Sequence, residues 1–326
     1  WPHKLALVEQ CPAGAGGARV QQLGELAVQW CLRGEVPRQP PSATFLPVYV
    51  LECPDHFSTV EYFDNLSSVS VGRLVVYADV LASTQLVAGA RLAHGAAAVA
   101  RRQRAGRGRA GNAWITPPGQ AATSLQLWTK ITPSLPLIQH ASALAVVLAI
   151  RTLPGYEDLD IRIKWPNDIY YGRDTKIGGT VTTANCTGDD VIVVVGTGVN
   201  ISNSVPTMCV NDVISEYNAR YGAALAPLSV ERFLARYFSH LERVIERLDA
   251  PDDVAAFLEL YYQYWLHTDE EIRVLSKDAS TPVAGTIIGV DAAGWLLVRA
   301  GAGAALRVQP DGNTFDIMAG LIAPKL

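Results

Sequence analysis

Cysteine is scarce in this sequence of 326 residues, and the spacing of the cysteines argues against both disulfides and zinc binding. The cysteines are Cys11, Cys31, Cys53, Cys186 and Cys209. An odd number of scattered cysteines without a CxxC pair argues against a disulfide framework and against a zinc site, and it favours reduced thiols. We therefore expect a cytoplasmic protein. Because the chain starts at Trp1 rather than at Met, a native leader segment is expected to be missing, and a mitochondrial location is an alternative.

Long hydrophobic runs and a strong excess of positive charge are also absent. No apolar run reaches the roughly 18 residues that a membrane-spanning helix needs, so we expect no membrane partner. The net charge is -4 and the pI about 5.9, which argues against a nucleic-acid partner. With 49% hydrophobic and 18% charged residues the chain is too apolar to be disordered, and its length predicts about two domains.

Asp and Glu are missing from the whole stretch between Val80 and Tyr156, whereas basic residues are not. The basic residues there are Arg91, Arg101, Arg102, Arg104, Arg107, Arg109, Lys130 and Arg151. Five of them lie within 101–109 and are interleaved with glycines. A focused positive field attracts anions, and glycine amides with guanidinium groups suit phosphate oxygens. A solvated basic loop without a ligand would have the same sequence pattern.

The distribution of hydrophobic residues divides the chain into three parts. Residues 1–56 are rich in Gly and Pro, and we interpret them as an N-terminal arm or the remnant of an upstream region, with one short helix over Val20–Leu32. Residues 57–268 combine helix and strand patterns, and residues 269–326 hold short strands separated by turns, which is typical of a small β-barrel. In the middle part, helices are expected over 57–66, 140–153, 229–248 and 252–265, and strands over 73–78, 96–101, 159–165, 178–183 and 191–196.

Three short motifs follow the basic stretch. Lys164-Trp-Pro-Asn-Asp168 ends an expected strand, a place where reactive side chains are often displayed, and its ammonium, amide and carboxylate could hold a polyphosphate with its metal ion. It could equally be a capped turn. Lys176-Ile-Gly-Gly179 contains a lysine that would normally be a surface residue. Gly196-Thr-Gly-Val-Asn200 lacks the spacing of a dinucleotide fingerprint or a P-loop.

The order of these motifs resembles that of a known family. Ser83-Thr84 comes first, followed by Gln103, the Gly106-Arg-Gly-Arg109 run and Trp114, and then by the three motifs above. Their joint appearance in this order is similar to the biotin protein ligases, most closely the eukaryotic holocarboxylase synthetases. The resemblance covers the chain from about Gly72 to Leu326, and residues 1–56 match no part of it.

The resemblance implies an α+β fold and a two-step reaction. Residues 57–268 would form a catalytic domain like that of class II aminoacyl-tRNA synthetases, with a mixed sheet flanked by helices, and residues 269–326 a small SH3-like β-barrel. The enzyme would convert biotin and ATP, with Mg²⁺, to biotinyl-5′-AMP and pyrophosphate. It would then transfer biotin to a lysine of the biotin-carrier domains of carboxylases. A lipoate-type ligase of the same fold and a non-catalytic biotin-binding module are the alternatives.

The resemblance also implies which residues bind biotin. Ser83, Thr84 and Gln103 would hydrogen-bond its ureido ring, a neutral group that needs neutral partners. The full set of expected biotin-binding residues is Ser83, Thr84, Gln103, Gly106, Arg107, Lys176 and Gly179. The family carries Asn or another small polar residue near Gln85, so the role of this side chain stays open.

Other residues are implied for ATP and for the chemistry. Lys176 would bridge the biotin carboxylate and the α-phosphate, while Arg107 and Arg109 would clamp the phosphate and close over the adenylate. The expected ATP-binding residues are Arg109, Trp114, Lys164, Asn167 and Asn200, with Asp168 as the Mg²⁺ ligand. The expected catalytic residues are Lys176, Arg107, Arg109, Lys164 and Asp168.

Two further expectations follow from the positions of these residues. All groups for adenylation precede Asp269, so the C-terminal barrel is expected to matter more for the transfer step. The Arg101–Trp114 segment is expected to be mobile without ligand and ordered by biotin with ATP. Its arginines repel one another, and its glycines give the backbone freedom.

Overall fold

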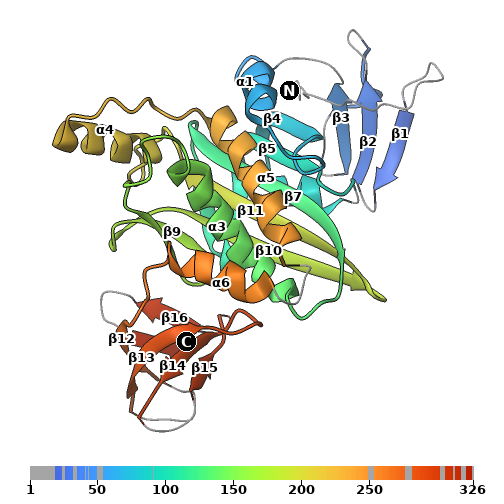
Figure 1. Cartoon of the computed structure of the whole chain (residues 1–326). Coiled ribbons are helices and arrows are strands. Elements are labelled where there is room, and N and C mark those ends of the chain that lie inside the picture. The colour runs from blue at the N-terminus through green and yellow to red at the C-terminus, as the bar shows by residue number, and fades with distance from the viewer. Residues whose placement is uncertain are drawn as a thin grey trace.

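A computed structural model describes residues 19–23, 26–31, 35–40, 42, 44–49, 54–90, 92–248, 253–275, 281–301, 305–310, 313–316 and 321–324 of the chain. In this part, three β-sheets follow one another along the sequence, and helices pack on the large middle sheet (Figure 1). No described helix is long and apolar enough to cross a membrane.

The large sheet is mixed and has eight strands. β4 and β5 pair in parallel, and the other pairs are antiparallel. In spatial order the strands are β4 (Val75–Leu81), β5 (Ala97–Arg107), β7 (Gln120–Lys130), β11 (Asp190–Asn200), β10 (Thr175–Thr187), β9 (Asp168–Tyr171) and β8 (Ile161–Lys164), and β6 (Ala113–Thr116) pairs with β5. The expected mixed sheet is confirmed.

Helices α3 (Ile138–Arg151) and α5 (Val230–Glu246) cover one face of the large sheet (Figure 1). Almost all of α3 is buried, as its apolar sequence predicts. α5 begins where the sequence predicts, because the Ser229 hydroxyl accepts a hydrogen bond from the Arg232 N–H and satisfies a donor of the first turn. The other α-helices of the described part are α1 (Thr59–Asn65), α2 (Thr84–Gly89), α4 (Val210–Tyr221) and α6 (Asp253–Tyr262).

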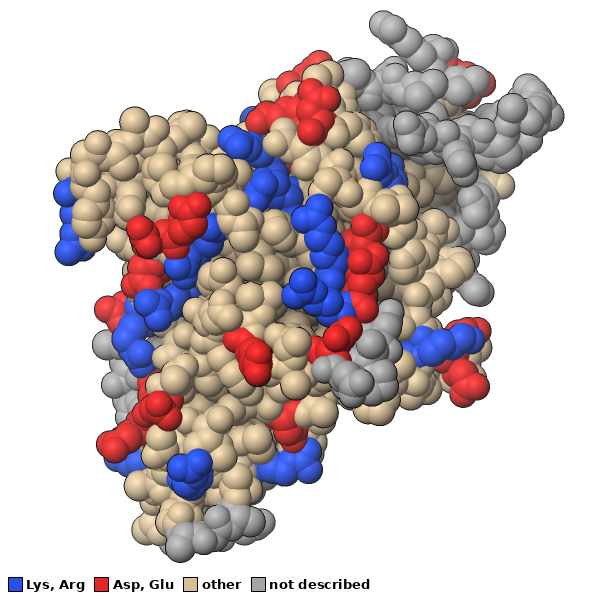
Figure 2. Space-filling model, viewed as in Figure 1, with Lys and Arg blue, Asp and Glu red and all other residues tan. Residues whose placement is uncertain are grey.

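Acidic and basic side chains are interspersed over this helix-bearing face (Figure 2). One buried acid on α5, Glu242, fixes the chain that leads into β4. Burial alone would raise its pKa, but the backbone N–H groups of Val69, Ser70 and Val71 donate to the carboxylate and bring the pKa below its usual value. These bonds anchor the start of β4, whose far end leads into the candidate site.

The expected helix over Val20–Leu32 is wrong, because this stretch forms strands of a small sheet. The strands are β1 (Arg19–Leu23), β2 (Leu26–Cys31) and β3 (Phe45–Tyr49). Tertiary packing decides the outcome, since Val28 and Val48 join a buried cluster with Val76 and Ala98 of the large sheet. The adjacent residues Val75 of β4 and Val99 of β5 pack under α3 and α5. Because side chains alternate along a strand, Val76 and Ala98 point to the opposite face of the large sheet, and the small sheet packs on that face.

The C-terminal part forms a separate sheet of six strands, which confirms the expected short strands, while their closure into an SH3-like barrel stays a prediction. Its order is β15 (Leu306–Val308), β14 (Leu296–Arg299), β13 (Val283–Val290), β12 (Glu271–Val274), β17 (Leu321–Pro324) and β16 (Asn313–Asp316). The segment before it pairs with β8: the Ile163 N–H donates to the Tyr264 carbonyl, and the Leu266 N–H donates to the Ile163 carbonyl. The exact domain boundary near Asp269 stays a prediction.

Candidate active site

A cavity of about 550 Å³ lies between the large sheet and the C-terminal sheet. Most of the residues singled out from the sequence line it, although they come from distant parts of the chain. These lining residues are Ser83, Thr84, Gln103, Arg107, Arg109, Trp114, Lys164, Asn167, Asp168, Lys176 and Gly179. Gly106 and Asn200 are not among its lining residues. The fold therefore brings the predicted residues to one place, while their individual roles stay predictions.

A group of neutral hydrogen-bonding residues belongs to the cavity lining. Ser83 caps the N-terminus of α2, and Thr84 follows it with its side chain buried. The Gln103 side-chain oxygen accepts from the Thr84 N–H at 2.8 Å, and the Gln103 amide nitrogen donates to the Thr116 hydroxyl at 2.9 Å. The hydroxyls of Thr84 and Ser124 lie 2.8 Å apart. This network fixes the side chains before any ligand enters.

The glycine- and arginine-rich segment is more regular than the sequence predicts. β5 does not end at Arg101 but continues to Arg107 and pairs with β6. The pairing requires glycine at position 106, because a Cβ there would lie 2.4 Å from the Trp114 carbonyl oxygen. Gly106 thus shapes the hairpin behind the cavity. The expected mobility of this segment stays a prediction.

Arg109 connects three parts of the site. Its guanidinium donates to the Asn167 side-chain oxygen at 2.9 Å and to the Pro310 carbonyl oxygen at 2.6 Å. Asn167 comes from the turn between β8 and β9, and Pro310 belongs to the C-terminal sheet region. Arg107 is exposed beside it and also lines the cavity. One arginine therefore ties the basic segment to both the large sheet and the C-terminal part.

The Lys164–Asp168 segment crosses from β8 to β9 along the edge of the cavity. The Lys176 ammonium donates to Asp168 Oδ1 at 2.7 Å and lies 5.7 Å from the Trp114 ring centroid. The Lys164 ammonium lies 5.2 Å from the Tyr170 ring centroid. Among the described lining residues there are four cationic side chains (Arg107, Arg109, Lys164 and Lys176) and a single carboxylate, that of Asp168, so an anionic ligand is favoured there.

The glycines of the Gly196–Asn200 motif make room for side chains above β11. A Cβ at Gly198 would lie 2.5 Å from Trp114 Nε1, and one at Gly196 would lie 2.7 Å from the Gln85 amide nitrogen. Trp114 Nε1 donates to Gln120, whose amide nitrogen donates to Asn200 Oδ1, both at 2.8 Å. Asn200 is thus placed behind Trp114 rather than on the cavity surface.

Several cavity residues on the large sheet belong to no motif that the sequence reveals. Thr123 and Ser124 of β7 line the cavity although they are almost fully buried. Polar residues within a central strand are the signal that could have found them, because buried polar groups need partners. Gln85 also lines the cavity, and its amide nitrogen is buried with no hydrogen-bond partner in the described part of the chain.

The C-terminal sheet region contributes to the cavity as well. Pro310, Phe315 and Ile322 are among the lining residues. The cavity lining therefore extends beyond Asp269, whereas the expectation that the adenylation groups all precede this residue stays a prediction. No motif in the sequence indicated this contact, because it depends on how the two sheets pack together.

Comparisons with known proteins give a family match and a shared fold. Residues 77–200 match the biotin/lipoate A/B protein ligase family. Biotin–protein ligase 2 of Arabidopsis thaliana is 31% identical over 278 residues, which cover 83% of each chain. The human biotin–protein ligase is 36% identical over 282 residues, which cover 83% of this chain and only 38% of the human one. The solved biotin protein ligase of Aquifex aeolicus, in complex with biotin and ATP, shares the fold with a TM-score of 0.54 at 20% identity, over 72% of this chain and 95% of that one.

Proposed function

This chain belongs to the biotin–protein ligases, and we propose that it activates biotin with ATP and then transfers biotin to a protein lysine. The observation that carries the proposal is the combination of two kinds of group in one cavity. Neutral donors and acceptors around Thr84 and Gln103 and four cationic side chains line the same cavity. A neutral ureido ring suits the first group, and a carboxylate with a triphosphate suits the second.

In the first step, the biotin carboxylate attacks the α-phosphorus of ATP, and pyrophosphate leaves. Two anions must approach each other, so fixed positive charge is needed where charge develops. Lys176 is the ammonium we assign to this place, with Arg107 and Arg109 on the phosphates. In the second step, a lysine amine of the acceptor attacks the acyl carbon, and AMP leaves. Neither step needs a nucleophilic side chain from this protein.

Biotin and the nucleotide are assigned to different residues. Ser83, Thr84 and Gln103 would hold the ureido ring. Gly106 and Gly179 have no side chain, so biotin would be able to approach their backbone closely. Trp114, Lys164 and Asn167 would hold ATP together with Arg109. Asn200 supports Trp114 through Gln120, and a direct contact between Asn200 and adenine stays a prediction.

Mg²⁺ would find few protein ligands in this cavity. Asp168 is the one carboxylate among the described lining residues, and no cluster of three or more His, Cys, Asp or Glu in the described ranges could hold a metal ion. Mg²⁺ commonly takes one or two carboxylates, several waters and substrate phosphates. The residues therefore fit an ion that enters with ATP, with Asp168 as its protein contact. Bound there, the ion would neutralise phosphate charge.

Pyrophosphate release tests the first step. We expect release from ATP with biotin and little release with lipoate, which lacks the ureido group. A lipoate-type ligase would give the reverse preference. Binding of biotin without release with either acid would indicate a non-catalytic module. Lys176→Ala serves as the catalytic control in each assay.

The acceptor is proposed to be a biotin-carrier domain of a carboxylase. A purified carrier domain, ATP and labelled biotin should give a labelled carrier, and the carrier with its target lysine changed to arginine should stay unlabelled. Equal labelling of both carriers would contradict site-specific transfer.

We also propose a cytoplasmic location, with mitochondria as the alternative. Cys31, Cys186 and Cys209 have free thiols, which suits a reducing compartment. Cell fractionation with an antibody against this chain tests the proposal, and recovery from the secreted fraction would overturn it.

A further inference from the structure

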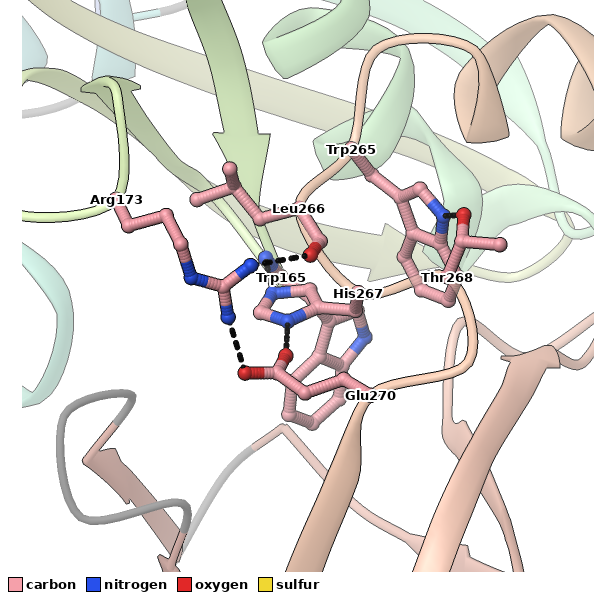
Figure 3. A network of polar contacts seen from close by, with 7 residues as sticks. All are labelled: Trp165, Arg173, Trp265, Leu266, His267, Thr268 and Glu270. Atoms are coloured by element: carbon pink, nitrogen blue, oxygen red, sulfur yellow. Dashed lines mark hydrogen bonds and ion pairs between the residues drawn. The ribbon is translucent and has the colours of Figure 1, made fainter.

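His267 lies where the large sheet meets the C-terminal sheet, and its side chain is fully buried (Figure 3). It follows the segment that pairs with β8 at Ile163, and it precedes β12. The proposed reaction gives this residue no role. A buried imidazole at such a junction is notable because each ring nitrogen can bind a different partner.

The ring accepts a hydrogen bond from the segment that carries three proposed ATP-site residues. The Trp165 backbone N–H donates to His267 Nε2 at 3.0 Å (Figure 3). Trp165 stands between Lys164 and the turn with Asn167 and Asp168. The backbone of this segment is thus held at its second residue by a side chain from outside the segment.

The other ring nitrogen fixes the protonation state. His267 Nδ1 lies 2.6 Å from Glu270 Oε2, and since Nε2 accepts, Nδ1 must carry the proton and donate it. The second oxygen of Glu270 pairs with Arg173, which also donates to the Leu266 carbonyl oxygen at 3.3 Å (Figure 3). Protonation of Nε2 would set two donors against each other at Trp165.

Burial keeps the His267 imidazole neutral. Burial lowers the pKa of the imidazole, the Glu270 carboxylate raises it, and the cations of Arg173 and Lys164 lower it further, with a net lowering. Nε2 is therefore an acceptor at neutral pH.

The His267 ring also contacts the C-terminal sheet. Its centroid lies 4.9 Å from that of Phe315, which lines the cavity. The Lys164 ammonium lies 5.9 Å from the same Phe315 ring. One side chain thus contacts both the backbone of the Lys164–Asp168 segment and a C-terminal residue of the cavity lining.

We propose that His267 is a positioning residue for the nucleotide side of the site. It holds the Trp165 backbone in the register that directs Lys164 and Asn167 to the cavity, and its ring keeps Phe315 against the same segment. The proposal rests on the proposed function, because it assigns the effect to ATP rather than to biotin.

Three variants distinguish a role of His267 in positioning the Lys164–Asp168 segment from a merely structural role. His267→Phe keeps an aromatic ring beside Phe315 but removes both ring nitrogens, so the Trp165 N–H is left unpaired and Glu270 loses the Nδ1–H donor. His267→Gln restores an acceptor near the position of Nε2. Thr268→Val is the matched control, because it removes only the hydrogen bond from Trp265 Nε1 in the same segment (Figure 3).

Initial rates of biotin-dependent pyrophosphate release give kcat/KM for ATP, and calorimetry gives the biotin Kd. We expect His267→Phe to lower kcat/KM for ATP about tenfold, the scale of one unpaired buried donor, with the biotin Kd changed by less than about twofold. His267→Gln should recover most of this loss, and Thr268→Val should leave both quantities unchanged. In the wild type, kcat/KM for ATP should also fall on acidification as His267 becomes protonated. His267→Gln has no imidazole and should not show this fall.

Other outcomes would overturn the inference. Wild-type kinetics in His267→Phe would show that His267 has no role in ATP use. If His267→Phe weakened ATP use and biotin binding equally, and His267→Gln recovered neither, His267 would have only a structural role. If His267→Phe does not fold, the test is the fall of kcat/KM for ATP on acidification, compared between the wild type and His267→Gln. The same fall in both proteins would refute the proposal. Absence of biotin-dependent release by the wild type would instead refute the proposed function.

Discussion

At the scale of single residues, the ion pair between Lys176 and Asp168 positions a group in the site and contributes little to the stability of the fold. Both side chains are partly exposed, so their hydrogen bond at 2.7 Å adds little to stability. The carboxylate instead holds the ammonium group at the cavity surface. Anionic substrates would then compete with Asp168 for that ammonium group.

Replacing Lys176 should affect chemistry and spare the fold. We expect Lys176→Ala to slow pyrophosphate release on the order of 10²–10³-fold, the usual cost of losing one preorganised donor. Lys176→Arg should be impaired as well, since a planar fork cannot replace a compact charge. Lys130→Ala is the control, because Lys130 is an exposed lysine paired with Asp190. Near-normal release by a well-folded Lys176→Ala protein would contradict the assigned role.

Gly198 should tolerate no side chain. In Gly198→Ala the new Cβ would lie 2.5 Å from Trp114 Nε1 and displace the indole ring. We expect the KM for ATP to rise about tenfold, as one hydrogen bond and the ring packing are lost. Gly89→Ala, in α2 with nothing within 4 Å of its Cβ, should leave the KM unchanged. A normal KM in Gly198→Ala would remove Trp114 from the ATP site.

Sequence patterns predicted the charged residues of the site better than the neutral ones. Arg107, Arg109 and Lys176 belong to motifs or to a stretch without acids, and the cavity contains all three. Thr123 and Ser124 have no such signal, because a lone polar residue in sequence does not reveal that its surroundings are apolar. Their importance depends on burial, which only the fold determines.

At the scale of elements, α3 and α5 were predictable because packing and local preference agree. An apolar run predicts a buried helix, and a Ser229 cap precedes a regular apolar stripe. β7 was missed for the opposite reason. Its buried polar residues Gln120, Ser124 and Gln126 share one face of the strand, and Thr123 lies on the other, so the strand pattern is obscured. β1 and β2 were mispredicted, since packing against the large sheet decides their conformation.

His140 on α3 should make folding stability depend on pH. Burial lowers its pKa from 6.5 to about 4, so between these values the unfolded chain binds more protons than the folded chain. Stability is therefore full above pH 6.5 and declines as the pH falls towards 4. At pH 5 the loss should be on the order of 2 kcal/mol. Urea unfolding of the wild type and His140→Leu at pH 7 and pH 5 measures it, and an equal loss in both proteins would exclude His140 as the cause.

At the scale of the whole molecule, the site belongs to two sheets. Arg109 donates to the Pro310 carbonyl oxygen, and Phe315 and Ile322 complete the cavity. The local sequence of the C-terminal part predicted its strands, but not this contact, because packing between sheets leaves no periodic signal. The C-terminal sheet should therefore act in adenylation as well as in transfer.

Phe315→Ala tests this dependence. We expect kcat/KM for ATP to fall about tenfold, since a buried ring beside Lys164 is removed and a cavity is left. Transfer from supplied biotinyl-5′-AMP to a carrier domain should change less. Ile288→Ala, a partly exposed position of the same sheet, is the control. A selective loss of transfer would restore the expectation derived from sequence.

The small β1–β2–β3 sheet has a consequence for solubility. It packs with valines and alanines of β4 and β5, among them Val76, Ala78 and Ala98, on the face that also carries α2 and lies opposite α3 and α5. A variant shortened to begin at residue 54 would bare this apolar patch to water while leaving the cavity residues in place. Such patches drive self-association. Light scattering should show concentration-dependent oligomers for the shortened variant, and lysines placed at Ala78 and Ala98 should return it to the monomer.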